Sequence, residues 1–134
     1  MRVCALVPAF DEADVIAPLV TAARRHVAEV VVVDDGSADE TRVRAEGAGA
    51  VVLQLTRNSG KGTALRHGLG YIRDRGFTHV LFMDGDGQHR PDDIPRLIEA
   101  ARAGADIVIG TRSFAKHAMP ASRHFSNTVG SRVP

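Results

Sequence analysis

The sequence predicts an α/β fold in which a mostly parallel sheet carries helices on both faces. Short apolar runs rich in β-branched residues recur along the chain, and they alternate with segments whose apolar residues are spaced as on one face of a helix. Such runs are typical of strands buried on both faces. Because strands and helices alternate with short links, we expect parallel strands joined by right-handed crossovers.

Five runs are predicted to be strands, and they cover residues 3–7, 30–33, 51–55, 80–83 and 107–109. Helical spacing predicts helices over residues 15–23, 64–72 and 94–101. Ser37 and Glu40 fit a capping box that would open a further short helix, ending near Gly47 and Gly49. Pro18 is compatible with the first helix if it falls in the first turn.

Composition indicates one soluble domain. The chain has 134 residues, of which 44% are hydrophobic and 25% charged. Cys4 is the single cysteine and sits in an apolar run, which predicts a buried thiol in a reducing compartment. No apolar run is long enough to span a bilayer, and the N-terminus lacks a signal-peptide pattern, so we expect a cytoplasmic protein. The net charge of +1 gives no argument for a nucleic-acid partner.

The end of the chain is basic. After Asp106 there is no acidic residue, and the cations that follow are Arg112, Lys116, Arg123 and Arg132. Such a segment suits an anionic lipid or phosphate, and it equally suits a solvated end. The residue types alone leave both interpretations open.

Polar motifs follow each of the predicted strands. They are PAFDE at 8–12, DDGS at 34–37, TRNSGKG at 56–62, DGDGQH at 84–89 and GTR at 110–112. The carboxyl ends of parallel strands share one edge of a sheet, and ligands bind in the crevice beside that edge. The sequence therefore predicts one site built from all five motifs.

Acidic residues in these motifs point to a cation. Asp34, Asp35, Asp84 and Asp86 would raise one another's pKa values unless a cation or hydrogen-bond donors compensated them. A divalent ion is the simplest remedy. The oxygens of Asp84, Asp86 and Gln88 are hard ligands that suit Mg²⁺ or Mn²⁺, which keep open positions for phosphates.

Glycine-flanked Lys61 complements the acidic motifs. It lies at a predicted helix start, where its charge and the backbone N–H groups could hold phosphate. Gly85 lets the backbone approach a ligand closely. Together these residues predict a site for a metal-bound diphosphate.

The motif set, in this order, resembles family 2 glycosyltransferases with the three-layer, Rossmann-like nucleotide-diphospho-sugar transferase fold. Within that family it is most similar to the polyprenyl-phosphate glycosyltransferases, of which dolichyl-phosphate mannose synthase is an example. The resemblance rests on PAFDE, DDGS, RNSGKG, the Asp-x-Asp-x-Gln-His run and GTR, and it covers residues 3–126.

The resemblance implies roles for residues on the donor side. Pro8, Phe10 and Glu12 match the motif that holds the nucleotide base and ribose, although the family often has tyrosine where Phe10 stands. Asp35, beside Asp34, matches the carboxylate that contacts the base. Further along, the family pattern places Asp84 on the nucleotide side and makes Asp86 and Gln88 the metal ligands.

It also implies an acceptor site and a mechanism. Arg112 matches an arginine near the transferred sugar and the acceptor phosphate, and Arg123 and Ser126 resemble a later pair that binds that phosphate. A metal held by Asp86 would neutralise charge on the departing nucleoside diphosphate while a polyprenyl phosphate attacks from the opposite face, which inverts the configuration. Asp86 and Arg112 are therefore the expected catalytic residues.

Family members normally continue beyond the equivalent of Pro134 into segments that complete the acceptor site, often at a membrane surface. We therefore expect residues 1–134 to be a single domain that carries the nucleotide-sugar side of the site, with the acceptor-side portion missing. Donor binding should survive in this chain, and transfer should be slow or absent. The donor would be of the GDP-mannose or UDP-glucose type, and the protein peripheral at the cytoplasmic face of a membrane.

Two other classes fit part of the pattern. A haloacid-dehalogenase-type phosphohydrolase would use Asp84 as nucleophile and Asp86 as acid/base, but that motif normally opens its fold, whereas three predicted strands precede it here. A non-catalytic receiver-like or nucleotide-binding domain would explain DDGS but not Asp84 and Asp86. His89 beside the metal motif is left open between a site residue and a packing residue, and Arg57 and Asn58 between phosphate binding and loop order.

Overall fold

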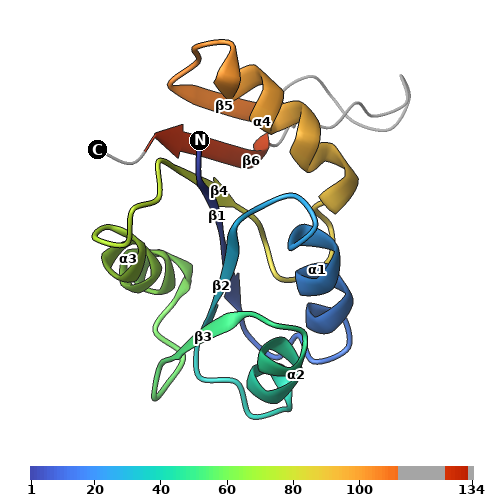
Figure 1. Ribbon diagram of the computed structural model, residues 1–134. Coiled ribbons are helices and arrows are strands. Elements are labelled where there is room, and N and C mark those ends of the chain that lie inside the picture. Colours follow the sequence, from blue (N-terminus) through green and yellow to red (C-terminus); the bar gives the residue numbers. More distant parts are fainter. Residues whose placement is uncertain (112–125, 133–134) are drawn as a thin grey trace, which may run out of the picture.

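A six-stranded sheet forms the centre of the protein, seen in the computed structural model of Figure 1. The structure describes residues 1–111 and 126–132, and the side chains of residues 1–109. In chain order the strands are β1 (Val3–Ala9), β2 (Glu29–Asp34), β3 (Val51–Gln54), β4 (His79–Phe82), β5 (Ile107–Thr111) and β6 (Ser126–Arg132). Their order across the sheet is β3-β2-β1-β4-β6-β5.

The first four strands are parallel, as predicted. β1 lies between β2 and β4, and Ala5 is opposite Val30 on one side and Leu81 on the other. β3 extends the sheet beyond β2. The chain moves outward in one direction from β1 to β2 and β3, then returns to place β4 on the other side of β1. That reversal creates a crevice beside the carboxyl ends of β1 and β4, the usual place for a ligand in such sheets.

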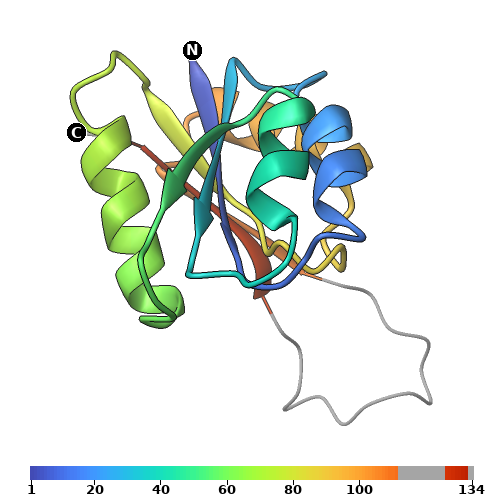
Figure 2. The same cartoon turned by 90° about the horizontal axis from the view of Figure 1, so that it is seen from below.

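Helices cover both faces of the sheet (Figure 2). One face packs against α1 (Ile16–Ala23), α2 (Thr41–Gly47) and α4 (Ile94–Arg102), the last preceded by the 3₁₀ turn η1 (Pro91–Asp93). The other face packs against α3 (Lys61–Ile72). Because side chains alternate along a strand, Ala5 and Val7 face the first group while Cys4 and Leu6 face α3. Burial on both sides explains the unbroken apolar run in β1.

The predicted helices are confirmed, with one correction to how α2 begins. The Ser37–Glu40 capping box does not form, because Ser37 Oγ accepts from the N–H of Asp11 and the Glu40 carboxylate pairs with Arg44. α2 starts at Thr41, whose N–H donates to Asp39 Oδ1 at 2.9 Å. Pro18 lies in the first turn of α1, where its missing N–H is tolerated.

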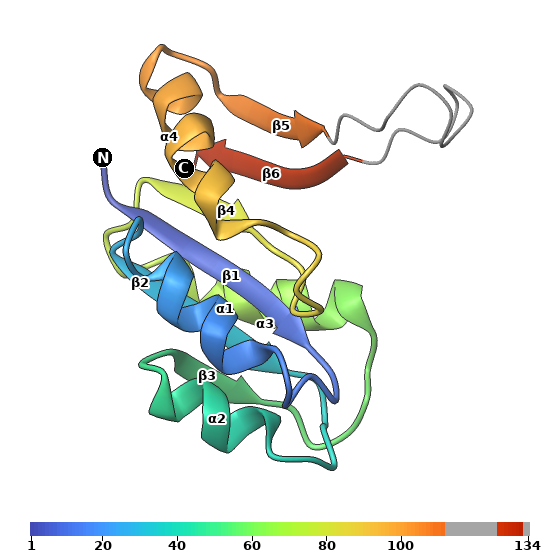
Figure 3. The same ribbon diagram turned by 90° about the vertical axis from the view of Figure 1, so that its right-hand side faces the viewer.

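Strand β6 is the element that the sequence did not predict. It lies between β4 and β5 and runs antiparallel to both, so the predicted strand at residues 107–109 does not pair directly with β4 (Figure 3). Its sequence, SNTVGSR, has a single large apolar residue and a glycine, which are weak strand signals. β4 and β5 both have backbone groups that need hydrogen-bond partners, and pairing with them stabilises β6 despite its weak local signal.

Cys4 is buried, as predicted, and burial raises the pKa of its thiol to about 12. It therefore stays protonated and packs as a small apolar residue. Among the residues that the structure describes, no helix is long and apolar enough to cross a membrane.

Candidate nucleotide and metal site

An open pocket of about 370 Å³ lies beside the carboxyl ends of β1 to β4, a volume within the range of small-molecule sites. It is built from four of the five predicted motifs. The residues that line it are Pro8, Ala9, Phe10, Glu12, Asp35, Asn58, Gly60, Lys61, Asp84, Gly85 and Asp86. The pocket is therefore at the edge where the sequence placed it.

Glycines allow the loops around the pocket to approach closely. A Cβ on Gly85 would lie 2.8 Å from the carbonyl oxygen of Pro8, so the loop after β4 touches the end of β1. Gly36 has a φ of 79°, and a Cβ there would lie 2.5 Å from the backbone of Arg57. A larger residue at either position would push apart two of the loops that line the pocket.

Asp35 is fixed by backbone donors. Its two carboxylate oxygens accept from the N–H groups of Ser59 and Gly60 at 2.8 and 2.9 Å, and its own N–H donates to Ala9 at 2.9 Å. The residue is 5% exposed. These donors compensate its charge, and they tie the loops after β1, β2 and β3 together.

Asp34 lies elsewhere. It is 1% exposed, and its Oδ1 accepts from the N–H of Ser37 at 3.0 Å. Its carbonyl oxygen accepts from the N–H of Leu55 at 2.8 Å. Of the predicted aspartate pair, only Asp35 lines the pocket, and Asp34 shapes the turn that presents it.

Lys61 and Asp84 face each other across the pocket and form an ion pair. Asp84 has a second basic neighbour in His89, which is 7% exposed. The N–H of Asp84 donates to His89 Nδ1 at 2.9 Å, so Nδ1 is unprotonated and the neutral ring carries its proton on Nε2, 3.6 Å from Asp84 Oδ2. His89 therefore has a structural role at the end of β4. Its place in the acidic motif was the only sequence signal for this.

Oxygen donors suited to a divalent ion lie on the loop after β4. Asp86 and Gln88 are exposed there, and Asp86 Oδ1 accepts from the N–H of Gln88 at 2.9 Å. Across residues 1–109, no cluster of three or more His, Cys, Asp or Glu side chains could hold a metal ion alone. The oxygens of Asp86 and Gln88 nevertheless fit Mg²⁺ or Mn²⁺. These ions commonly bind through one or two carboxylates and complete their coordination with water and substrate phosphates.

The electrostatics of the pocket also favour a cation. Four carboxylates and a single Lys line it among the described residues. The pKa of Glu12 is raised, first by partial burial and then by the charges of Asp86, Asp39 and Asp11. Added positive charge near Asp86 would relieve this repulsion.

The remaining predicted residues fall in three places. Asn58 lines the pocket, and its Oδ1 accepts from the N–H of Gly60 at 3.2 Å, so it orders the loop as well. Arg57 is exposed and is not among the lining residues. Arg112 and Arg123 lie outside the described residues, and Ser126 is the first residue of β6, with only its backbone described.

The strand order around β1, together with a pocket at its reversal point, defines a doubly wound α/β domain with a site where such sheets bind their ligands. The family described as Glycosyl transferase family 2 matches residues 4–130, and the chain belongs to it. This membership accounts for the three strands before Asp84, which the phosphohydrolase alternative left unexplained, and for Asp84 and Asp86, which the receiver-like alternative left unexplained.

Curated relatives are longer than this chain. The undecaprenyl-phosphate mannosyltransferase of Micrococcus luteus is 37% identical over 100% of this chain and 59% of its own length. The polyprenol monophosphomannose synthase of Mycolicibacterium smegmatis is 32% identical over 83% of this chain and 45% of its own length. The chain thus spans about half the length of these proteins.

Solved structures share the fold. The glucosyl-3-phosphoglycerate synthase of Mycobacterium tuberculosis, in complex with Mn²⁺, UDP-glucose and phosphoglyceric acid, matches with a TM-score of 0.68 and 26% identity. The match covers 79% of this chain and 42% of that one. The predicted α/β fold class is confirmed by this likeness.

Proposed function

We propose that residues 1–134 form the nucleotide-sugar side of an inverting, metal-dependent glycosyltransferase that moves a hexose to a polyprenyl phosphate. The observation that carries this proposal is the pocket beside β1 to β4, which brings Asp35, Lys61 and the Asp84–Asp86 loop to one edge of the sheet. The names of the Micrococcus and Mycolicibacterium relatives support a polyprenyl phosphate acceptor and a mannosyl group.

Residues on two sides of the pocket would hold the donor. Phe10 is 43% exposed, which leaves its ring free to pack on a base, and the fixed carboxylate of Asp35 can accept from base N–H groups. Pro8 and Glu12, which line the pocket, would lie beside the ribose. Lys61 would bind the diphosphate through its ammonium group, helped by the backbone at the start of α3. A donor of the GDP-mannose or UDP-glucose type fits this arrangement.

Asp86 and Gln88 would hold Mg²⁺ or Mn²⁺, with Asp84 directed at the nucleotide. The bound ion supplies charge neutralisation for the departing nucleoside diphosphate. The structural relative that contains Mn²⁺ and UDP-glucose supports this choice of ion and donor class. The role of the protein is to place the carboxylates on a loop that Gly85 and His89 fix against β1 and β4.

The acceptor oxygen needs no general base. A polyprenyl phosphate is already an anion at neutral pH, so its oxygen can form the new bond to the anomeric carbon as the bond to the nucleoside diphosphate breaks. Attack from the face opposite the leaving group inverts the configuration. We assign Arg112, Arg123 and Ser126 to the acceptor phosphate, since arginine binds phosphate bidentately.

Binding titrations test the proposal. We expect GDP or UDP to bind more tightly with Mn²⁺ or Mg²⁺ than with EDTA. Asp86→Asn should largely abolish this metal dependence, because a carboxylate ligand becomes a neutral amide. Asp92→Asn, in the exposed turn η1, is the matched control and should behave as the wild type. Equal metal dependence in the wild type and Asp86→Asn would contradict the assignment.

A further inference from the structure

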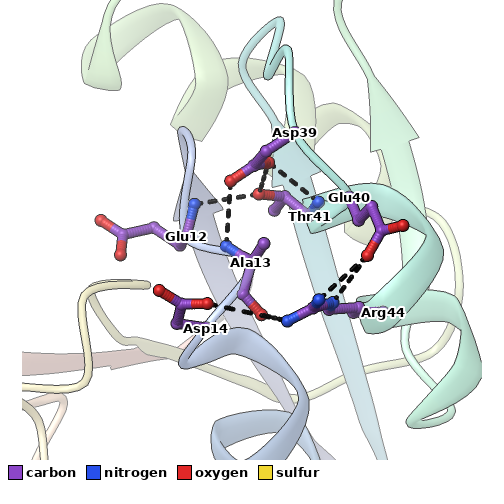
Figure 4. A network of polar contacts seen from close by, with 7 residues as sticks. All are labelled: Glu12, Ala13, Asp14, Asp39, Glu40, Thr41 and Arg44. Carbon is purple, nitrogen blue, oxygen red and sulfur yellow. Dashed lines mark hydrogen bonds and ion pairs between the residues drawn. The ribbon is translucent and has the colours of Figure 1, made fainter.

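Hydrogen bonds join the loop after β1 to the loop after β2 behind one wall of the pocket. We call this contact the loop clasp, and define it as Asp11–Ala13 on one side and Ser37–Thr41 on the other. The N–H of Glu12 donates to Thr41 Oγ1 at 2.9 Å, and the N–H of Ala13 donates to Asp39 Oδ2 at 3.2 Å. Figure 4 shows these two bonds converging on the start of α2.

Thr41 is the buried centre of the loop clasp. It is 0% exposed, and its hydroxyl donates to Asp39 Oδ1, so its lone pair is left to accept from Glu12. Asp39 also accepts from the N–H of Thr41 at 2.9 Å. The N–H of Glu12 is partly buried, and it would lose its hydrogen-bond partner without the Thr41 hydroxyl, so this hydroxyl fixes the backbone at Glu12.

The backbone that the loop clasp holds is unusual. Asp11 has a φ of 51°, a left-handed conformation that is uncommon for non-glycine residues and that Asp tolerates better than most. Its N–H donates to Ser37 Oγ and its Oδ1 accepts from the N–H of Ala38, both at 2.9 Å. Asp11 separates Phe10 from Glu12, and both of those residues line the pocket.

Neither Thr41 nor Asp39 lines the pocket. We propose that Thr41 and Asp39 are positioning residues, which hold Phe10 and Glu12 in the arrangement that binds the donor nucleotide without touching the nucleotide. This inference rests on the proposed function of the pocket. In this inference, two residues outside the pocket fix the wall that Phe10 and Glu12 form.

The test compares three variants of the full chain. Thr41→Val removes the hydroxyl and keeps the shape, Thr41→Ser keeps the hydroxyl, and Thr78→Val is the matched control. Thr78 Oγ1 accepts from the N–H of Arg2 at 2.8 Å, which is the same kind of bond at the amino-terminal ends of β1 and β4, away from the pocket. Affinity for GDP and UDP with Mn²⁺ is measured by calorimetry, and Tm is measured for each variant.

We expect Thr41→Val to weaken the affinity of whichever nucleotide binds by about tenfold. Thr41→Ser should stay within about twofold of the wild type, and Thr78→Val should lower Tm without changing the affinity. If Thr41→Val does not fold, Asp39→Ala replaces it, because Asp39 is exposed and the change leaves no cavity.

Two negative results are distinguishable. If the wild type binds neither nucleotide, the proposed function fails and the positioning role fails with it. If the wild type binds and Thr41→Val binds equally well, the positioning role alone is wrong, and the loop clasp serves stability only.

Discussion

Lys61 is the one cation that faces the carboxylates of the pocket among the described residues, and its ion pair with Asp84 joins the start of α3 to the end of β4. The Lys61 ammonium group is the counter-ion of the Asp84 carboxylate. A metal ion bound nearby would be repelled by this ammonium group and would compete with it for the carboxylates. A bound diphosphate would be attracted to it.

Lys61→Met should therefore have opposite effects on two ligands. We expect Mn²⁺ alone to bind up to about fivefold more tightly, because an exposed ion pair contributes about 1 kcal/mol or less. With Mn²⁺ saturating, GDP or UDP should bind about tenfold more weakly, because a charge-assisted phosphate contact is lost. Titration calorimetry measures both affinities. Arg66→Met, an exposed cation on the same helix, is the control, and a change of the same sign for both ligands would contradict the exchange.

Glu12 gives a pH-dependent prediction. Its raised pKa means that the folded protein disfavours the ionised form, so the stability of the wild type should fall as the pH rises through the range just above the ordinary value of 4.5. Glu12→Gln removes that charge. We expect the variant to be more stable at pH 7 by roughly 0.5 kcal/mol or less after allowing for solvent screening, and equal to the wild type near pH 4. Urea unfolding at the two pH values measures this, and a pH-independent gain would contradict it.

At the scale of elements, the packing of α3 on the sheet depends on one glycine. A Cβ on Gly68 would lie 2.2 Å from Leu6 Cδ1, and the Leu6 side chain is fully buried. Gly70, in the same helix, has nothing within 4 Å of its Cβ position. An alanine at Gly68 would change both the packing and the helix propensity, whereas an alanine at Gly70 would change the helix propensity alone.

We expect Gly68→Ala to destabilise the protein by about 1–2 kcal/mol, since overpacking costs more than the gain in helix propensity. Gly70→Ala should stabilise it by up to about 1 kcal/mol. Circular dichroism during urea unfolding measures both changes. If both variants gained stability, the close contact between α3 and β1 would be wrong.

At the scale of the whole molecule, the end of the sequence carries basic residues and no acidic ones. The acidic motifs surround the pocket, whereas no acidic residue follows Asp106 and the cations of GTR and the tail come after it. A negatively charged pocket suits a metal-bound donor, and basic residues later in the sequence suit an anionic acceptor. This arrangement agrees with the proposed transfer to a polyprenyl phosphate.

The basic segment gives the last prediction. We expect weak cosedimentation with vesicles that contain polyprenyl phosphate, and a loss of binding as salt is added. Arg112→Ala should reduce binding more than Lys116→Ala, because Arg112 belongs to the GTR motif and can bind phosphate bidentately. Salt-independent binding, or equal losses in the two variants, would show that the segment is only a solvated end.

Local patterns in the sequence predicted the parallel part of the sheet, the helices and the edge that carries the pocket. Each of these follows from a short-range rule. Apolar runs that alternate with helical segments identify buried strands. Motifs that follow parallel strands must lie at the same edge of the sheet. For the same reason the positions of Asp35, Lys61 and Asp84 in the sequence were enough to predict that they lie together.

The tertiary structure alone decided the details that depend on distant partners. Asp34 and Asp35 are adjacent, yet only Asp35 meets the N–H groups of Ser59 and Gly60, because successive side chains at a strand end point in different directions. Thr41 binds the backbone of Glu12 across 29 positions. β6 exists because two strand edges offered it hydrogen bonds, not because its residues favour a strand. Such contacts depend on which distant groups folding brings together, so a local sequence pattern cannot predict them.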